Sequence, residues 1–440
     1  MSQPVTDALE NVRQQYDQTP YPRVPLEQSP KQDATNLYTH NLVTAFYLRN
    51  QQIINTQGAV ILDAGCGTGY KSLMLAEANP GAMIVGVDLS PESVKLAEQR
   101  LKHYDFHQAE FYAISIEDLP SLNLQFDYIN ADEVLYLLPD PVAGLQAMRS
   151  VLKPNGIIRT NYHNSLQRAA YFRAQEFFKA VGLMSGDSQE ADVELVRQTM
   201  QSLKDHVFVK ATAWKPLFET HDESILMNHL LRGDKGWTIP EFFAAMRTAN
   251  LEFISMVNWR EWDLLSLFTD VDELPLSIVL ELSEKSTEEQ LHLFELLHQA
   301  HRLLDVWCGH PNTDTAYMPV AEWTTDRWQT AQAHLHPQLK TGALKEDLIA
   351  CVTQSNPFEI SRHLKIVDEP VSIDSFKAGC LLPLLEQPQS VTALAQRWQT
   401  LCPFNPVTLE PTTLETAFER VQQLLTTLEN LGYILLECPA

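Results

Sequence analysis

The stretch ILDAGCGTGY, Ile61 to Tyr70, places three glycines and a cysteine directly after an apolar run and an acid. The apolar run is typical of a short buried strand, and glycines behind it let the backbone approach a ligand closely. These glycines are spaced G-x-G-x-G, whereas a dinucleotide-binding loop is spaced G-x-G-x-x-G. The last glycine of such a loop would fall at Tyr70, so the spacing favours a ligand that lacks a pyrophosphate.

A second acid follows the glycine loop at the separation expected for a nucleoside ligand. Asp88 ends the apolar run MIVGVD, about 20 residues after Gly69. A carboxylate there can accept hydrogen bonds from both hydroxyls of a ribose. The competing interpretation is a helix N-cap, but Ser90 already stands in that role. The two signals together predict a nucleoside-binding site.

Apolar runs and helical segments alternate through the first third of the chain. The expected strands are residues 59–65, 82–88, 109–115, 126–132 and 156–163, and the expected helices between them are 69–79, 90–105 and 140–152. Continuous apolar strands that alternate with helices predict an α/β fold with a parallel sheet covered on both faces. Ligands bind such sheets beyond the carboxyl ends of the strands, which is where the glycine loop and the second acid fall.

Composition limits the classes of function. The chain has 440 residues, which suggests two or three domains. A formal net charge of −24 argues against nucleic-acid binding, which requires a basic surface. No apolar run approaches the ~20 residues of a membrane span, and the N-terminus lacks the apolar core of a signal peptide. Six cysteines without a C-x-x-C pair indicate a reducing compartment, so we expect a cytoplasmic protein.

The motifs, taken in order, resemble those of class I S-adenosylmethionine-dependent methyltransferases. The series reads VILDAGCGTG, VGVDLS, SIEDLP, FDYINADEVLYLLPDP and LKPNGIIR, over about residues 58–160. The resemblance implies a Rossmann-like sheet of seven strands and S-adenosylmethionine as the methyl donor.

The resemblance also implies positions around the cofactor. The residues implied to border its methionine part are Asp63, Gly65, Cys66, Gly67 and Gly69. Asp88 would hold the ribose, Leu89 would pack on the adenine, and the backbone carbonyl of Asn130 would meet the amino group.

This sequence departs from the family pattern in two places. Ser115 stands where the family usually has the acid that binds adenine, so adenine recognition falls to Ser115, Glu117 or the backbone of Ile116. Where many relatives read LHHLP, this chain reads LYLLP from Leu135 to Pro139. Relatives that use one of those histidines as a base are therefore poor guides to its mechanism.

Methyl transfer from a sulfonium needs alignment and exclusion of water, and it needs a base only where the nucleophile carries a proton. Polar residues near the strand ends are Asp132, Glu133, Tyr136, Tyr162 and His163. We select Tyr136 and His163 as the catalytic candidates. The alternatives are a tyrosine packed under a loop, a surface or capping histidine and, for the two acids, a solvated turn.

A proline- and tyrosine-rich leader precedes these motifs. Its segment YDQTPYPR resembles NPYPR segments of some bacterial methyltransferases, and its prolines exclude a regular helix. Such a leader suits a flap over the cofactor or substrate, in which Arg23 could pair with the cofactor carboxylate. The alternative is a tail packed on the sheet edge.

The chain changes character after residue 165. The stretch GWTIPEFFAAMRTANLEFI loosely resembles the regulatory domain of certain bacterial methyltransferases, including protein-lysine methyltransferases. Residues 286–309 are predicted to form one helix, on which His298 and His301 share a face. Because no third ligand has suitable spacing, we expect no metal site.

The last region reads helix, turn, helix and short strand, which predicts a winged-helix-like domain. From Val367 to Ala440 there are nine acids and three bases, so protein contact or a structural role is favoured over DNA binding. The predicted domains are an N-terminal flap (1–36), a catalytic domain (37–165), a helical substrate or regulatory domain (166–325) and the winged-helix-like domain (326–440).

The predicted function is methyl transfer from S-adenosylmethionine to a protein side chain or a small metabolite. Two alternatives remain. One is a non-catalytic S-adenosylmethionine-binding sensor or assembly protein, and the other is a nicotinamide-dependent oxidoreductase.

Overall fold

A computed structural model describes Arg13, Asp17 and residues 20–184, 189–311, 318–405 and 407–438. The other residues of the predicted flap before Pro20, Tyr16 among them, lie outside this part of the chain. The described residues belong to two compact units. The glycine-loop unit comprises 20–113, 126–128, 318–405 and 407–438, and the β5 unit comprises 114–125, 129–184 and 189–311 together with Arg13 and Asp17.

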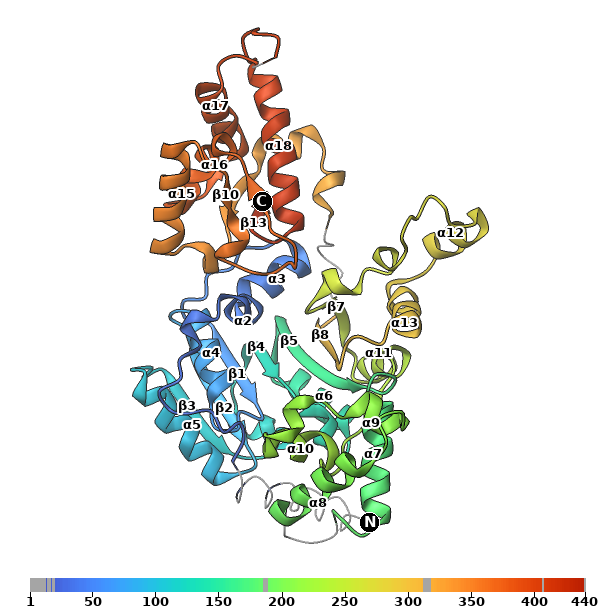
Figure 1. Cartoon of the computed structure of the whole chain (residues 1–440). Coiled ribbons are helices and arrows are strands. Elements are labelled where there is room, and N and C mark those ends of the chain that lie inside the picture. Colours follow the sequence, from blue (N-terminus) through green and yellow to red (C-terminus); the bar gives the residue numbers. More distant parts are fainter. Residues whose placement is uncertain are drawn as a thin grey trace. The chain divides into compact units, whose positions relative to one another are not determined.

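The largest sheet has the strand order β3-β2-β1-β4-β5-β8-β7, and a short β6 pairs with β5. Its strands are β1 Val60–Ala64, β2 Met83–Asp88, β3 Ala109–Ala113, β4 Phe126–Ala131, β5 Leu152–Asn164, β6 Gly236–Trp237, β7 Glu252–Met256 and β8 Leu303–Gly309. The first three pair in parallel, with Leu62 opposite Val85 (Figure 1). All five strands expected from the apolar runs are present, which confirms the prediction of a Rossmann-like α/β sheet.

The prediction of one helix over residues 286–309 is wrong. Helix α13 ends at Leu297, and β8 then runs antiparallel to β5 along seven paired residues, from His163–Leu303 to Ile157–Gly309. A short apolar run such as LLDVWCG fits a buried strand as well as a buried helix, and periodicity alone cannot separate them. The sheet therefore continues beyond residue 165, into the segment predicted to be a separate helical domain.

In the glycine-loop unit, helices α4 and α5 follow β1 and β2. The helices of this part are α2 Ala34–His40, α3 Leu42–Asn50, α4 Tyr70–Ala78 and α5 Pro91–His103. Helix α5 begins as the sequence predicts, because the Ser90 side chain accepts the N–H of Ser93 and Pro91 occupies the first turn.

The C-terminal part of the same unit builds a small sheet with helices. Strand β9 (Gln332–Leu335) lies between β12 (Gln389–Ser390) and β13 (Ile434–Glu437), and a separate pair joins β10 (Phe358–Glu359) to β11 (Ser372–Ile373). The helices are α14 Thr325–Thr330, α15 Gly342–Gln354, α16 Ser375–Leu381, α17 Val391–Leu401 and α18 Leu414–Asn430. The predicted order of helix, helix and strand corresponds to α17, α18 and β13, and the winged-helix assignment stays a prediction.

This C-terminal part is joined to α3 by buried polar contacts. The Tyr47 hydroxyl donates to Glu429 Oε1 at 2.8 Å and accepts the N–H of Leu436 at 3.0 Å. His336 Nε2 lies 3.0 Å from Thr44 Oγ1. Residues far apart in sequence thus fold as one core.

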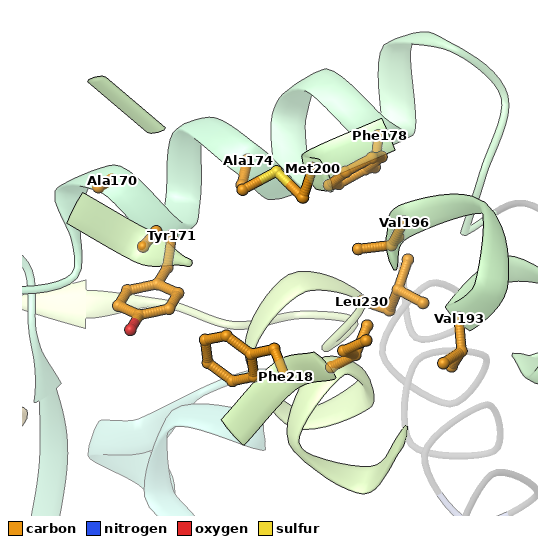
Figure 2. Close-up of a cluster of buried hydrophobic side chains, with 11 residues drawn as sticks. Ala170, Tyr171, Ala174, Phe178, Val193, Val196, Met200, Phe218 and Leu230 are labelled. Carbon is orange, nitrogen blue, oxygen red and sulfur yellow. The ribbon is translucent and has the colours of Figure 1, made fainter. Parts of the chain in front are cut away.

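In the β5 unit, helices surround β5 and the strands that follow it. They are α6 Pro141–Ser150, α7 Ala169–Ala180, α8 Gln189–Ser202, α9 Phe208–Ala213, α10 Asp222–His229, α11 Ile239–Thr248, α12 Leu276–Ser283 and α13 Thr287–Leu297. Figure 2 shows the apolar core of four of them, in which Ala174 and Phe178 of α7 face Val196 and Met200 of α8. No helix among the described residues combines the length and apolar character needed to cross a bilayer.

Candidate functional site

The glycine loop turns sharply between β1 and α4. Gly65, Gly67 and Gly69 have φ values of 76°, 50° and 80°, which lie in the left-handed region that favours glycine. The N–H groups of Gly65 and Cys66 both donate to the carbonyl oxygen of Val87, at 2.8 and 2.9 Å. These bonds hold the loop against the end of β2.

Two of these glycines are required by contacts within the chain. A Cβ on Gly69 would lie 2.6 Å from the Cα of Ala97 in α5, and a Cβ on Gly67 would lie 2.2 Å from the carbonyl oxygen of Tyr21. Both separations are far below van der Waals contact. The glycines were interpreted as allowing a ligand to approach the backbone closely. They also allow helix α5 and the leader to pack against the loop.

The leader residues 20–25 lie on the glycine loop. The N–H of Thr68 donates to the carbonyl oxygen of Tyr21 at 3.0 Å, and its hydroxyl donates to that of Pro22 at 2.7 Å. The Arg100 guanidinium donates to the carbonyl of Thr68 at 2.9 Å and to two leader carbonyls at 2.7 and 3.0 Å. One arginine of α5 thus binds the loop and the leader together.

Asp88 is the link between β2 and the glycine loop. Its Oδ2 accepts the N–H of Gly67 and its Oδ1 accepts the N–H of Ser90, both at 2.9 Å. A carboxylate oxygen has more than one lone pair, so one oxygen can accept more than one hydrogen bond. The neighbouring Leu89 is half-buried.

The other implied cofactor residues of this unit differ in exposure. Asp63 is buried, and its Oδ2 accepts the hydroxyl of Ser72 at 2.6 Å. Cys66 is also buried, and burial, together with the charges of Asp88 and Asp63, raises the pKa of its thiol well above the ordinary value. The thiol therefore stays protonated and is a poor nucleophile. Arg23 is exposed on the leader.

The β5 unit carries the residues implied near the adenine and the amino group. Ser115 caps the short 3-10 helix Ile116–Leu122, because its hydroxyl accepts the N–H of Glu117 at 3.3 Å. Asn130 in β4 is fully buried, and its side-chain oxygen lies 3.4 Å from Arg159 Nη1. The serine at the position of the family's acid thus serves as a helix cap.

The ends of β4 and β5 are joined by side-chain hydrogen bonds. Asn161 Nδ2 donates to Asp132 Oδ1 at 2.6 Å, and Asn161 Oδ1 accepts the N–H of Glu133 at 2.8 Å. Glu133 has a φ of 58°, an uncommon conformation for a residue other than glycine. These two acids are therefore parts of an ordered turn, and Asp132 is nearly buried.

His163, at the end of β5, is the centre of a buried polar network. Its Nδ1 lies 2.5 Å from Asp234 Oδ1, while Asp234 Oδ2 accepts hydrogen bonds from Arg168 at 2.8 Å and from Gln175 at 2.9 Å. Its Nε2 lies 3.1 Å from Arg302 Nη1. The side chains of His163 and Asp234 are 1% and 0% exposed, so His163 is not the surface histidine that one interpretation allowed.

Aromatic rings enclose this network. The Tyr136 ring stacks on His163 with a centroid distance of 3.9 Å, and the Tyr162 ring stacks on Trp237 at 3.7 Å. The Tyr136 hydroxyl lies 3.4 Å from Glu133 Oε2. Burial raises the pKa of Tyr162 far above its ordinary value, so this phenol stays protonated.

The histidine pair considered for a metal does not share a helix face. His298 follows the last residue of α13, and the ring of His301 stacks on Trp262 at 4.4 Å. Within the described residues, no three histidine, cysteine, aspartate or glutamate side chains are grouped as a metal site would require.

Comparison with known proteins agrees with the fold and with the motif series. Residues 55–221 match the family model of a methyltransferase domain. The chain contains a methyltransferase domain. The solved structure of PKMT2 from Rickettsia typhi in complex with AdoHcy shares its fold, with a TM-score of 0.58 and 18% identity over 94% of this chain and 76% of that chain.

Curated relatives match parts of the chain. An uncharacterized protein of Synechococcus sp. is 33% identical over 174 residues, which are 39% of this chain and 40% of that protein. Ubiquinone biosynthesis O-methyltransferase of Xanthomonas campestris is 39% identical over 103 residues, or 23% of this chain and 41% of that enzyme. The chain thus spans about two fifths of the length of each of these relatives.

Sequence reasoning missed Asp234 and Arg302, the two groups that contact the nitrogens of His163. Both lie beyond residue 221, where the match to the methyltransferase domain ends. Asp234 stands in the loop before β6, and Arg302 stands directly before β8. No spacing rule connects them to His163, and the misassigned helix over 286–309 hid the strand that carries Arg302 to β5.

Proposed function

We propose that the protein transfers a methyl group from S-adenosylmethionine to a protein side chain or a small metabolite. The observation that carries this proposal is the match of residues 55–221 to a methyltransferase domain. The glycine loop and Asp88 support it independently, because they provide backbone access and a carboxylate at the end of adjacent parallel strands.

The residues of the glycine-loop unit fit the nucleoside and methionine parts of this cofactor. Asp88, whose oxygens lie at the loop and accept the N–H groups of Gly67 and Ser90, would accept the ribose hydroxyls. Leu89 packs on the adenine, and Asp63 with the loop Gly65–Gly69 borders the methionine part.

The other cofactor positions that the motif series implies, the backbone of Ile116, the side chain of Glu117 and the carbonyl of Asn130, belong to the β5 unit and stay predictions. Arg23 of the leader pairs with the cofactor carboxylate. These assignments follow the motif positions, and the Asp88→Ala variant described below tests the one for the ribose.

The bound cofactor supplies a methyl group that is already activated as a sulfonium. The chain's own residues orient the acceptor in line with that methyl group and exclude water. Tyr136 and His163 are the residues we assign to the acceptor, since both belong to the ordered cluster at the ends of β4 and β5.

The reaction belongs in a reducing compartment, and we propose the cytoplasm. All six cysteines are free thiols, as expected where disulfides do not persist. The net charge of −24 favours a basic or neutral acceptor over a nucleic acid.

Two measurements test the proposal. Thermal unfolding with S-adenosylhomocysteine or NAD separates a methyltransferase from an oxidoreductase, and we expect stabilisation by S-adenosylhomocysteine alone. Formation of S-adenosylhomocysteine from S-adenosylmethionine in the presence of cell extract then tests turnover. Binding without turnover across varied extracts would assign the chain to the alternative class, a non-catalytic sensor or assembly protein.

A further inference from the structure

One nitrogen atom lies between a carboxylate and an imidazole. Arg302 Nη1 is 3.2 Å from Glu133 Oε2 and 3.1 Å from His163 Nε2. The other terminal nitrogen of Arg302 pairs with Glu133 Oε1. A guanidinium only donates hydrogen bonds, so both Glu133 and His163 act as acceptors at this position.

The partners of His163 determine which ring nitrogen carries the proton. Asp234 Oδ1 lies 2.5 Å from Nδ1, and an ionised carboxylate only accepts, so the proton is on Nδ1. Nε2 then presents its lone pair to Arg302, which donates to it. This is the neutral tautomer that a base requires, with an orienting carboxylate on the far nitrogen.

The surroundings keep Asp234 ionised. Arg168 Nη2 and Gln175 Nε2 both donate to Oδ2, and all of these contacts are buried. Burial by itself would raise the pKa of Asp234, but the hydrogen bond from His163 and the charge of Arg168 bring it below its ordinary value.

The same surroundings keep His163 neutral. Burial lowers the pKa of His163, and the charges of Arg168 and Arg302 act in the same direction. The hydrogen bond and the charge of Asp234 oppose them without reversing the shift. The stacked Tyr136 ring completes the groups that face this imidazole.

The side chains of His163 and Asp234 differ in exposure from those of Arg302 and Glu133, which lie beside them. The side chains of His163 and Asp234 are essentially inaccessible, whereas those of Arg302 and Glu133 are 40% and 34% exposed. Ion pairs with this much exposure contribute little to stability, because water competes for both charges. Arg302 is therefore the solvent-accessible partner of the imidazole, and Asp234 is the buried one.

We propose that the position between Glu133 and His163, filled here by Arg302 Nη1, receives the proton-bearing nucleophile of the methyl acceptor, with His163 as its base and Asp234 as the positioning residue. This inference rests on the proposed function. It defines the acceptor as a group with an N–H or O–H bond, either an amine in its ammonium form or a hydroxyl. Arg302 marks the position because it presents an N–H group to the same two acceptors.

The reaction at this position balances as follows. His163 Nε2 takes a proton from the acceptor, and the freed lone pair of the acceptor attacks the methyl carbon. The new N–C or O–C bond forms while the S–C bond breaks, and its electron pair stays on sulfur. S-adenosylhomocysteine leaves, and the imidazolium returns its proton to water.

An ammonium at this position would lose part of its hydration, because the imidazole on one side of it is buried. An amine of the lysine type has a pKa of about 10.4 in water. Desolvation disfavours the charged form and lowers that value, which reduces the gap to the imidazole. Glu133 aligns the ammonium before the proton is transferred.

The first test measures the initial rate of tritium transfer from labelled S-adenosylmethionine to desalted cell extract. We expect His163→Gln and Asp234→Asn each to lose about 100-fold or more of the rate, the usual contribution of a general base. His229→Gln is the matched control, because His229 is also a buried histidine of the β5 unit, packed against Tyr171 and Phe218.

The pH profile separates a base from a merely structural histidine. Wild-type transfer should be constant above about pH 6.5 and fall at lower pH, where His163 becomes protonated. The residual rate of His163→Gln should lack that fall. Binding of S-adenosylhomocysteine by each variant, measured by calorimetry, should match wild type and so exclude a loss of fold.

The labelled product provides the second test. N-methyl or O-methyl ether products agree with the proposal, whereas base-labile methyl esters or S-methyl products overturn it. His163→Gln with a wild-type rate and pH profile also overturns it. Failure of the wild-type protein to transfer tritium at all would instead refute the proposed function.

Discussion

At the scale of single residues, Asp88 has a role that the sequence did not indicate. Its two oxygens hold the N–H groups of Gly67 and Ser90, so the carboxylate shapes the loop before any ligand arrives. The ribose role proposed for it would use the same two oxygens. A change at this residue should therefore affect the loop and the ligand together.

Replacing Asp88 with alanine should abolish the thermal stabilisation by S-adenosylhomocysteine. A ligand at 100 times its Kd stabilises a protein by about 2.7 kcal/mol, and the variant should lose nearly all of this. The measurement is thermal unfolding with and without S-adenosylhomocysteine. Glu98→Ala on the exposed side of α5 is the control, and it should respond as wild type does. Normal binding by Asp88→Ala would show that the cofactor is wrongly placed.

At the scale of elements, the leader and the glycine loop form one assembly. Thr68 and Arg100 bind the leader carbonyls, and Gly67 leaves the space in which Tyr21 lies. The leader's sequence allows two interpretations, a flap and a tail on the sheet edge. The described part, from Pro20 onward, lies on the loop itself.

Gly67→Ala should displace the leader from the loop. The new Cβ would lie 2.2 Å from the carbonyl oxygen of Tyr21, in addition to the cost of a left-handed alanine. Gly58→Ala is a matched control, since Gly58 also has a positive φ but nothing within 4 Å of the added Cβ. The control should lose about 1–2 kcal/mol of unfolding free energy, and Gly67→Ala should lose more.

Limited proteolysis and denaturant unfolding of both variants check this expectation. Gly67→Ala should be cleaved faster than Gly58→Ala within residues 20–25. Equal losses of stability and equal cleavage in the two variants would show that the leader does not depend on this contact.

At the scale of the whole molecule, neutral histidines are buried in both units. Burial lowers the pKa of His229 and His334 to about 4 and that of His336 to about 3. The ring of His336 is also hydrogen-bonded, since its Nδ1 accepts the N–H of Gln338 at 3.2 Å and its Nε2 contacts Thr44 Oγ1. Protonation of this ring in the folded state is therefore costly.

These histidines should make the protein less stable in mild acid. Their pKa values are lower in the folded chain than in the unfolded chain. Their contribution to the free energy of unfolding is therefore intact above about pH 6.5 and is lost as the pH falls toward 4. Each such histidine reduces the unfolding free energy by about 1.4 kcal/mol per pH unit in that window. Calorimetry from pH 8 to pH 4.5 on wild type and His336→Gln checks this. A variant with the same slope as wild type would contradict it.

The sequence predicted the part of the molecule whose signals are local. Apolar runs located β1 to β5, and Ser90 with Pro91 located the start of α5, because each depends on neighbouring residues. The pairing of β8 with β5 is a long-range interaction, and an apolar run of seven residues does not indicate it.

The residues of the candidate site were likewise predictable only where the signal is local in the sequence. His163 and Glu133 were identifiable at strand ends, but Asp234 and Arg302 reach His163 only through the folding of loops 71 and 139 residues away along the chain. Such partners carry no spacing signal. Burial of His163, which decides its protonation state, is likewise a property of the tertiary structure.

The most direct test of the account is tritium transfer from labelled S-adenosylmethionine to native cell extract, with Asp88→Ala in parallel. We predict a tritiated product that is stable after the cofactor is removed, formed by the wild-type protein and reduced by at least about 100-fold in Asp88→Ala at subsaturating cofactor, the ratio that about 2.7 kcal/mol of lost binding represents. Binding of S-adenosylhomocysteine by the wild type without any labelled product, across extracts of varied origin, would contradict the claim that this chain is a methyltransferase.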